Sequence, residues 1–309
     1  MAETDAHLYQ SPNRRHDRRF FYKYVSATIA KTILETRKLR WSSPLCFNDP
    51  FDISPELWLN FDVPGILAAF ANELTVLIDE GNFSTLPRDP ILRAILSLLK
   101  RQSSPDVRRQ IVEKLRHESS ATAAGQMQDF AELNQRWRDF LPTFRILCLS
   151  ELNDVTSMWL HYADSYQGAV LEFECVDELD SPYLVARPVI YQDTPPAITS
   201  MQVWARRMLG RGETTYRELF KEYQYIKATA WSYEREWRIV SFARSGESGL
   251  FSDYSFNPRE LTGIYLGAHC SMEDQAGILS LLTHGFEHVS AYRACVGGAK
   301  AKFTFQRIR

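Results

Sequence analysis

The amino-acid sequence predicts an α+β protein with a mixed, mostly antiparallel sheet and one helical insert. Short segments rich in aromatic and β-branched residues recur along the chain and are typical of strands. Helical patterns interrupt them in irregular order, and residues 64–137 are helical in pattern, so this is no alternating βαβ series. There is no GxGxxG after a strand and no GxxxxGK[ST], which disfavours the Rossmann and P-loop classes.

Local patterns place the elements in order. Strands are predicted at residues 20–25, 39–43, 143–150, 168–173, 183–191, 235–242, 261–267, 289–295 and 301–308. Helices are predicted at residues 27–36, 66–78, 90–99, from 104 onward, as a short helix within 153–164, and at 197–209, 213–229 and 271–283. Ser26 and Ser271 are placed to cap two of them. Residues 1–19 are predicted to form a flexible polar arm, and residues 20–309 a single domain.

Composition argues against several classes of protein, among them membrane-spanning and disulfide-stabilised proteins. A net charge of −2 gives no global field that would attract nucleic acid or an anionic membrane, although it leaves room for a local basic patch. No apolar run is long enough to span a bilayer. The five cysteines are scattered and never in CxxC spacing, which argues against disulfides and a zinc site, so we expect no metal and a reducing cytoplasm.

The most informative stretch is residues 231–240, WSYEREWRIV. Alternation along a strand would place Glu234, Glu236 and Arg238 on one face. Two neighbouring carboxylates repel each other unless a cation or a ligand compensates, and Arg238 is a candidate compensator. One interpretation is a solvated face with an ion pair; the other is a catalytic acid held on a rigid strand beside a second acid. Lys227, near the end of the predicted 213–229 helix, is interpreted as compensating the helix dipole.

Three further segments carry candidate site residues. In the first strand, Lys23 lies between Tyr22 and Tyr24. In one interpretation the tyrosines border the core and the lysine extends to solvent. In the other, the strand lines a pocket for an anionic or aromatic ligand. The turn at residues 46–52, CFNDPFD, is either structural or a rigid loop that presents Asn48 and Asp49. The short helix near residue 160 places His161 and Tyr162 either in structural roles or at the mouth of a pocket.

These motifs, in this order, resemble a bacterial family of unknown function, DUF2971. The resemblance runs from about residue 20 to residue 267 and rests on FYKY at 21–24, FNDPFD at 47–52, MWxHYA at 158–163 with Gly168, and WxYExEWR at 231–238. The family implies no settled activity.

A remoter resemblance links the order of elements to ADP-ribosyltransferases, with DNA-targeting DarT-type toxins as the comparison. It implies a split sheet of that type, NAD as substrate, and Glu236 as the late-strand glutamate that orients the nicotinamide ribose and activates the acceptor. Glu234 would complete a Glu-x-Glu pair. Tyr22 to Tyr24 occupy the place of the first-strand His, Arg or Tyr, with the departure that Lys23 stands within them. The strand at residues 39–43 supplies Ser42.

If the resemblance holds, a carboxylate would stabilise the oxocarbenium character that develops as the nicotinamide–ribose bond breaks. Tyr and Trp side chains would stack on nicotinamide, and Lys23 or Arg238 would meet the pyrophosphate. Asn48, Asp49, His161, Tyr162 and Trp231 are further candidates for contact with the cofactor. The first hypothesis is therefore an NAD-consuming transferase or hydrolase, a toxin or anti-phage effector, whose acceptor is nucleic acid, protein or water.

Two alternatives stay open. One is a non-catalytic module that binds a nucleotide or nucleic acid in the same pocket. The other is that all four motifs only specify the fold. A Glu236→Gln variant separates them: catalysis predicts lost turnover with an unchanged melting temperature, whereas a fold-specifying role predicts lost stability.

Overall fold

The computed structural model describes residues 9–58, 62–80, 90–101, 104, 106–107, 109–110, 113, 120–194, 200–209, 221, 223–296 and 303–309. It divides the chain into two compact units. Unit 1 comprises Met1–Asp52, Leu141–Asp193 and Tyr225–Arg309, and unit 2 comprises Ile53–Phe140 and Thr194–Gln224. Unit 2 contains the helical insert predicted at residues 64–137. Among the described residues, no helix combines the length and apolar character needed to cross a membrane.

Unit 1 is built on a mostly antiparallel sheet, which confirms the predicted α+β class. Its strands are β1 (Phe20–Val25), β2 (Lys38–Ser42), β3 (Phe144–Ser150), β4 (Ala169–Glu174), β5 (Arg187–Pro188), β8 (Glu236–Phe242), β9 (Phe251–Ser255), β10 (Leu261–Leu266), β11 (Ser290–Val296) and β12 (Phe303–Arg307). The order is β12-β11-β10-β4-β1-β3-β2-β9, with β8 paired to β3 and β5. β10 and β11 pair in parallel. β6 (Ile190–Tyr191) and β7 (Ile226–Lys227) form a separate parallel pair.

The pairing of β1 with its two neighbours in the sheet is unequal. β1 pairs with β4 along its whole length, from Phe20 opposite Glu174 to Val25 opposite Ala169. Its pairing with β3 is confined to Tyr22 opposite Ser150. Backbone groups of β3 that do not pair with β1 can therefore bond to side chains. Lys23 Nζ, for example, donates to the carbonyl of Cys148 on β3 at 2.9 Å.

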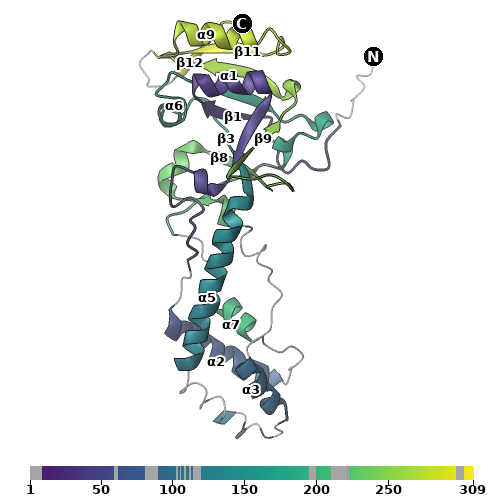
Figure 1. Cartoon of the computed structure of the whole chain (residues 1–309), viewed down its shortest axis with the longest axis vertical. Coiled ribbons are helices and arrows are strands. Elements are labelled where there is room, and N and C mark those ends of the chain that lie inside the picture. Colours follow the sequence, from purple (N-terminus) through teal and green to yellow (C-terminus); the bar gives the residue numbers. More distant parts are fainter. Residues whose placement is uncertain are drawn as a thin grey trace, which may run out of the picture. The chain divides into compact units, whose positions relative to one another are not determined.

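Helices α1 (Ala27–Thr36) and α9 (Met272–Leu281) lie together over one face of this sheet (Figure 1). Their apolar residues, such as Ile33 and Ile278, are buried against Leu171 and Ile264 of the strands. Ser26 accepts a hydrogen bond from the amide of Ile29, and Ser271 from that of Asp274, so both predicted caps are confirmed.

The opposite face carries a smaller aromatic cluster around α6 (Thr156–His161). Trp159 is completely buried there and packs edge-on against Tyr24 at 5.6 Å. After α6 the chain turns through three consecutive left-handed residues, Asp164, Ser165 and Tyr166. Close backbone packing fixes this turn, because a Cβ on Gly168 would lie 2.1 Å from the carbonyl oxygen of Val25.

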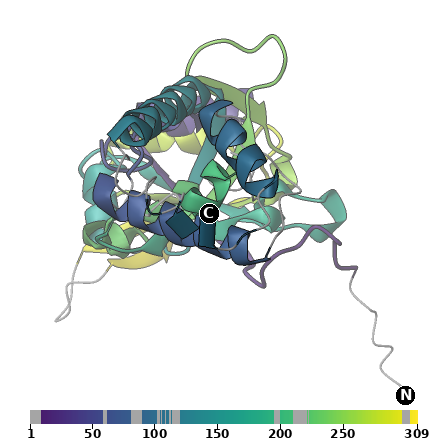
Figure 2. The same cartoon turned by 90° about the horizontal axis from the view of Figure 1, so that it is seen from below.

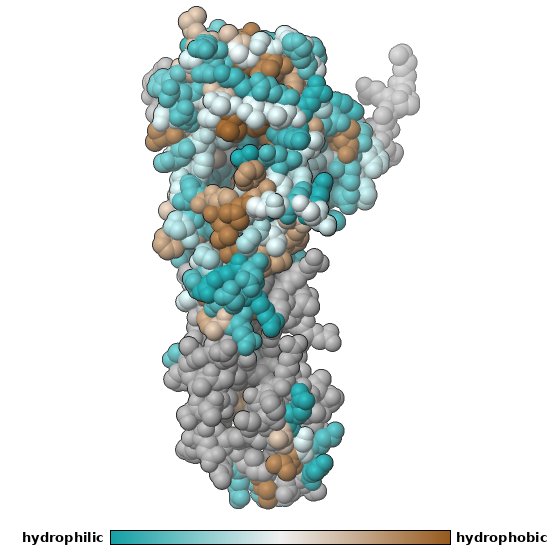
Figure 3. Space-filling model, viewed as in Figure 1, coloured by the Kyte–Doolittle hydropathy of each residue, from teal (hydrophilic) through white to brown (hydrophobic). Residues whose placement is uncertain are grey.

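Residues 11–19, which the sequence assigned to a flexible arm, lie beside the 3-10 helices η3 (Asp177–Leu179) and η4 (Pro182–Val185) in both views of the cartoon (Figures 1 and 2). Asp177 accepts from the amide of Ser11 and from the guanidinium of Arg14. Residues 1–8 of the arm lie outside the described residues. The surface of unit 1 mixes apolar patches with hydrophilic side chains (Figure 3).

Unit 2 is helical, with α2 (Val63–Glu80), α3 (Pro90–Arg101), α5 (Ser120–Phe140) and α7 (Met201–Met208). Its core includes the buried side chains of Leu74, Leu77, Leu96 and Trp137. The Trp137 indole donates to the carbonyl of Ser54 at 2.8 Å. The helix predicted from Ser104 onward falls largely on residues outside the described part.

Two predicted elements are wrong. The helix predicted at residues 213–229 does not reach its expected end, because η5 (Tyr223–Tyr225) and then β7 occupy residues 223–227. The strand predicted at 183–191 is broken into η4, β5 and β6, with Pro188 unable to donate to a ladder. β9 was not predicted, because the polar residues of its sequence, FSDYS, are not typical of a strand.

Candidate functional site

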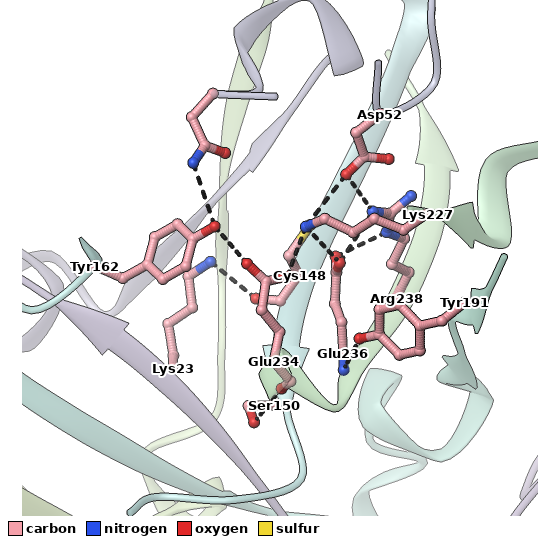
Figure 4. A network of polar contacts seen from close by, with 11 residues as sticks. Lys23, Asp52, Cys148, Ser150, Tyr162, Tyr191, Lys227, Glu234, Glu236 and Arg238 are labelled. Carbon is pink, nitrogen blue, oxygen red and sulfur yellow. Dashed lines mark hydrogen bonds and ion pairs between the residues drawn. The ribbon is translucent and has the colours of Figure 1, made fainter. Parts of the chain in front are cut away.

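The site is centred on the junction between η6 (Thr229–Glu234) and β8. Arg235 adopts a left-handed conformation that ends η6, and Glu236 then begins the strand. Glu236 and Arg238 share a strand face, as the alternation predicted. Glu234 precedes the strand, but the turn at Arg235 brings its side chain to the same group of charges (Figure 4).

Five charged side chains form what we call the charged cluster: Asp52, Lys227, Glu234, Glu236 and Arg238. Lys227 Nζ lies 2.6 Å from Glu234 Oε2, 3.1 Å from Glu236 Oε2 and 3.4 Å from Asp52 Oδ2. Arg238 donates to both oxygens of Glu236, at 2.7 and 3.0 Å, and to Asp52 Oδ2 at 2.6 Å. One lysine therefore bridges the two glutamates, while the arginine pairs with Glu236 and Asp52.

The cluster is buried, which rules out the solvated strand face. Side-chain exposure is 0% for Arg238, 2% for Asp52, 3% for Glu234, and 5% for Lys227 and Glu236. Three carboxylates face two cations, so the fully ionised cluster carries one excess negative charge. Burying charges costs free energy, and apolar replacements of such groups are often equally or more stable. Stability alone therefore gives little reason for this arrangement.

The pKa values of the two glutamates are shifted in opposite directions. Burial would raise the pKa of Glu236, but attraction to Arg238 and Lys227 outweighs it and holds that pKa well below the ordinary value. Burial raises the pKa of Glu234, and repulsion from Glu236 adds to the rise against the pull of Lys227. Burial likewise raises the pKa of Asp52. The surroundings of Glu236 thus favour its anionic form, whereas burial favours the protonated forms of Glu234 and Asp52.

Glu234 connects the cluster to exposed residues. Its Oε1 accepts a hydrogen bond from the Tyr162 hydroxyl at 2.6 Å, and that hydroxyl accepts from the exposed Asn48 amide at 3.3 Å. Burial, reinforced by Glu234, raises the pKa of Tyr162, so the phenol stays a donor.

An aromatic rim surrounds this connection, formed by His161, Tyr162, Trp231 and Tyr233. His161 is exposed and the other three are half-buried. His161 lies 6.5 Å from the rings of both Trp231 and Tyr233, and Lys227 Nζ lies 5.0 Å from the Trp231 ring centroid. The rim offers flat apolar surfaces, and one of its members, Tyr162, contacts the Glu234 carboxyl directly.

Neighbouring strands fix the backbone of the two glutamates. Ser150 donates its hydroxyl to the Glu234 carbonyl at 2.7 Å, and the Glu236 amide donates to the Tyr191 hydroxyl at 2.8 Å. The Cys148 thiol hydrogen-bonds to Glu236, and burial raises the pKa of that thiol. These contacts hold both carboxylates on rigid elements of unit 1.

The structure brings together most of the residues predicted to form the site: Asn48, His161, Tyr162, Trp231, Glu234, Glu236 and Arg238. Lys23 reaches the cluster's edge through Cys148. Other predicted residues lie elsewhere. Asp49 is buried and accepts from the Phe51 amide, as in a structural turn. Ser42 ends β2, opposite Ile146 and Phe251.

Tyr24 and Tyr22 also do not join the cluster. The Tyr24 hydroxyl donates to the Leu152 carbonyl, and the first-strand tyrosines face Val170 and Glu172 of β4. Both tyrosines therefore pack on the sheet face opposite α1.

Sequence reasoning missed Asp52 and Lys227. Asp52 is the last residue of the 47–52 motif, so the sequence held a signal for it. Asn48 and Asp49 were predicted instead because of their turn chemistry. Lys227 was assigned to a helix end, whereas β7 buries it, with 6% of the residue exposed. Lys227 lowers the pKa of both glutamates, and Arg238 lowers that of Glu236 further. Among the described residues, no group of three or more His, Cys, Asp or Glu side chains is arranged to hold a metal ion.

Comparison with known proteins gives one match. Residues 158–239 match the family described as protein of unknown function (DUF2971), which confirms the predicted family resemblance over that range. The motifs at residues 21–24 and 47–52 lie outside the matched range. No curated protein and no solved structure matches the chain. The matched range contains the aromatic rim and the charged cluster except Asp52.

Proposed function

We propose that this chain, whose residues 158–239 match the DUF2971 family, is an NAD-consuming enzyme, an ADP-ribosyltransferase or NAD glycohydrolase. The observation that carries the proposal is the buried pair Glu234 and Glu236, which stand two residues apart in sequence. Lys227 bridges their carboxylates, and their surroundings raise the pKa of Glu234 and lower that of Glu236. Two neighbouring carboxyl groups whose pKa values are shifted apart commonly supply a proton-transfer group and a fixed anion in the same site.

The roles follow from the contacts. The nicotinamide–ribose bond breaks with its electron pair leaving on nicotinamide, and a bond forms from the ribose carbon to the oxygen or nitrogen of the acceptor. The acceptor's proton passes to the Glu234 carboxylate, whose raised pKa makes it the stronger base. Glu236 is a positioning residue, because its oxygens are held by Arg238 and Lys227. This assigns the catalytic role to Glu234, although the sequence had favoured Glu236.

Other features support the substrate class. The aromatic rim suits stacking on a nicotinamide or adenine ring. The narrow contact between β1 and β3 supports a split sheet of the ADP-ribosyltransferase type. We further propose that the enzyme acts in a reducing cytoplasm as a toxin or anti-phage effector, with its cysteines as thiols.

The test is thermal denaturation with and without millimolar NAD, followed by nicotinamide release from the same samples. A ligand at a hundredfold over its dissociation constant stabilises by about 2.7 kcal/mol, which is visible as a shift of a few degrees. We expect a shift and nicotinamide release in the wild type, and a shift without release in Glu234→Gln. Asp253→Asn, an exposed partner of Arg40 far from these contacts, is the matched control. Neither shift nor release in the wild type would refute the proposal, and a shift without release would favour a nucleotide-binding module.

A further inference from the structure

The segment of residues 11–19, which we call the strap, is bonded to unit 1 along its length. Its first residues are held by η3, as described above. In its middle, the Arg15 amide donates to the Leu184 carbonyl of η4 at 2.8 Å. Near its end, Arg18 forms an ion pair with Glu151, the residue that follows β3. The strap therefore connects the 3-10 helices of unit 1 to the end of a sheet strand.

His16, at the centre of the strap, uses both of its ring nitrogens. Nε2 lies 2.9 Å from the Tyr183 carbonyl oxygen, and the Arg18 amide donates to Nδ1 at 3.1 Å. A carbonyl can only accept and an amide N–H can only donate, so these partners require a neutral ring with its hydrogen on Nε2. The ring also packs edge-on against Phe21 at 5.2 Å and Trp237 at 5.0 Å. A second proton on Nδ1 would face the Arg18 N–H, so a protonated ring cannot keep both bonds.

The surroundings of His16 favour its neutral form. Burial lowers the pKa of His16, and the charges of Arg14 and Arg18 lower it further. The bond to the Tyr183 carbonyl and the charge of Asp17 act in the opposite direction but do not outweigh them. The rings that β1 and β8 pack against the imidazole are apolar. Because the pKa is lowered, the closed strap is fully stabilised above 6.5, the ordinary value, and loses this stabilisation as the pH falls below it.

Arg18 links the strap to the turn between the two glutamates of the charged cluster. Its guanidinium carbon lies 5.5 Å from the centroid of the Trp237 ring, and it pairs with Glu151. Glu151 in turn pairs with Arg235 at 2.6 Å and accepts from the Trp237 indole at 3.0 Å. Arg235 is the left-handed residue that separates the two glutamates, so Glu151 braces the turn from both sides of the second one.

We propose that His16 is a pH-sensitive latch whose protonation releases the strap. The strap otherwise contains four arginines and one aspartate as ionisable residues, and their charges do not change between about pH 5 and 7. When the strap is released, Arg18 no longer contacts Glu151, and the turn at Arg235 loses part of its support. This inference concerns the strap and the turn themselves and does not require NAD to be the substrate. If the proposed function is correct, mild acid lowers activity by loosening the glutamate pair.

The experiment is hydrogen exchange of the full chain without NAD, measured by mass spectrometry at about pH 7.5 and about pH 5.5 and corrected for the intrinsic exchange rate. Linkage to one proton gives a loss of up to about tenfold in the protection of the strap, because the lower pH is about one unit below 6.5. Residues 231–238 should lose protection by a smaller factor. Helix α9, which packs on the other face of the sheet, should keep its protection.

Three variants separate the latch from other effects of acid. His16→Gln retains a donor and an acceptor but does not titrate, so the protection of the strap should no longer depend on pH. Arg18→Ala keeps the backbone amide that bonds to His16 and removes the contact with Glu151, so the strap should still respond to pH and residues 231–238 should not. His284→Gln, at an exposed histidine beyond α9, is the matched control and should respond like the wild type.

The inference is overturned if the protection of the strap is the same at both pH values, if His16→Gln retains the wild-type loss, or if α9 loses protection by the same factor. A pH response of residues 231–238 that persists in Arg18→Ala would overturn the link to the turn. If His16→Gln fails to fold, ring-nitrogen NMR of the wild type decides the question. The latch requires the Nε2–H tautomer at about pH 7.5 and a His16 pKa below 6.5, and the other tautomer or a higher pKa would overturn it.

Discussion

Replacing Glu236 by Gln should destabilise unit 1 far more than replacing Glu234. Glu236 neutralises Arg238, whose side chain has no exposure, through contacts at 2.7 and 3.0 Å, and it also contacts Lys227. Removing one partner of a buried ion pair typically costs 3–5 kcal/mol. Because Arg238 keeps Asp52 at 2.6 Å, we expect the lower end, about 3 kcal/mol.

Glu234→Gln should be mild by comparison. The fully ionised cluster has one excess negative charge, and Glu234 is the glutamate whose pKa is raised, so neutralising it removes repulsion. Its amide oxygen can still accept from Tyr162 or Lys227. We expect a loss of about 1 kcal/mol, the usual net value of one hydrogen bond.

The assay is urea denaturation at neutral pH, followed by circular dichroism and tryptophan fluorescence, with free energies from linear extrapolation. Asp253→Asn breaks an exposed ion pair with Arg40 and should stay within about 0.5 kcal/mol of the wild type. The reasoning is refuted if Glu236→Gln is as stable as that control, or if Glu234→Gln costs more than Glu236→Gln.

Three further predictions concern other contacts. Lys227→Met leaves three buried carboxylates with Arg238 as their remaining cation in the cluster, and should cost at least about 3 kcal/mol in the same urea assay. Gly168→Ala forces a Cβ to within 2.1 Å of a backbone oxygen and should cost about 1–3 kcal/mol or more, whereas Gly277→Ala, with ordinary contacts in α9, should be neutral or stabilising in thermal melts. Hydrogen bonds from Ser252, the Arg244 amide and Tyr254 lower the pKa of Glu247 from 4.5 to about 2, so its contribution is complete above pH 4.5 and lost as pH falls toward 2. Glu247→Gln should remove that part of the acid dependence in a pH titration of stability.

Much of unit 1 could be predicted because its signals are local. Caps such as Ser26, the aromatic first strand and the alternation from Glu236 to Arg238 each depend on neighbours in sequence. The same locality explains the errors. Lys227 follows a stretch with a helical pattern, but β7 pairs it with Tyr191 of β6, a partner that no local pattern reveals.

The chemistry of the site needed contacts that are distant in sequence. Alternation predicted that Glu236 and Arg238 would meet, and the two glutamates were chosen correctly as neighbours. The opposite shifts of their pKa values depend on burial and on charges from distant segments, with Lys227 acting on both glutamates and Arg238 on Glu236. Ser42 and Asp49 show the converse. The resemblance in the order of elements selected Ser42 and turn chemistry selected Asp49, but the fold places both away from the charged cluster.

The most direct test of the account is the pH dependence of nicotinamide release from NAD by the full chain. A base is active when deprotonated, so kcat should rise with pH through a pKa above 4.5, the ordinary glutamate value. Glu234→Gln should abolish release while retaining NAD binding, and Asp253→Asn should match the wild type. Absence of nicotinamide release from the wild type at every pH, or wild-type turnover in Glu234→Gln, would contradict the assignment of Glu234 as the catalytic carboxyl.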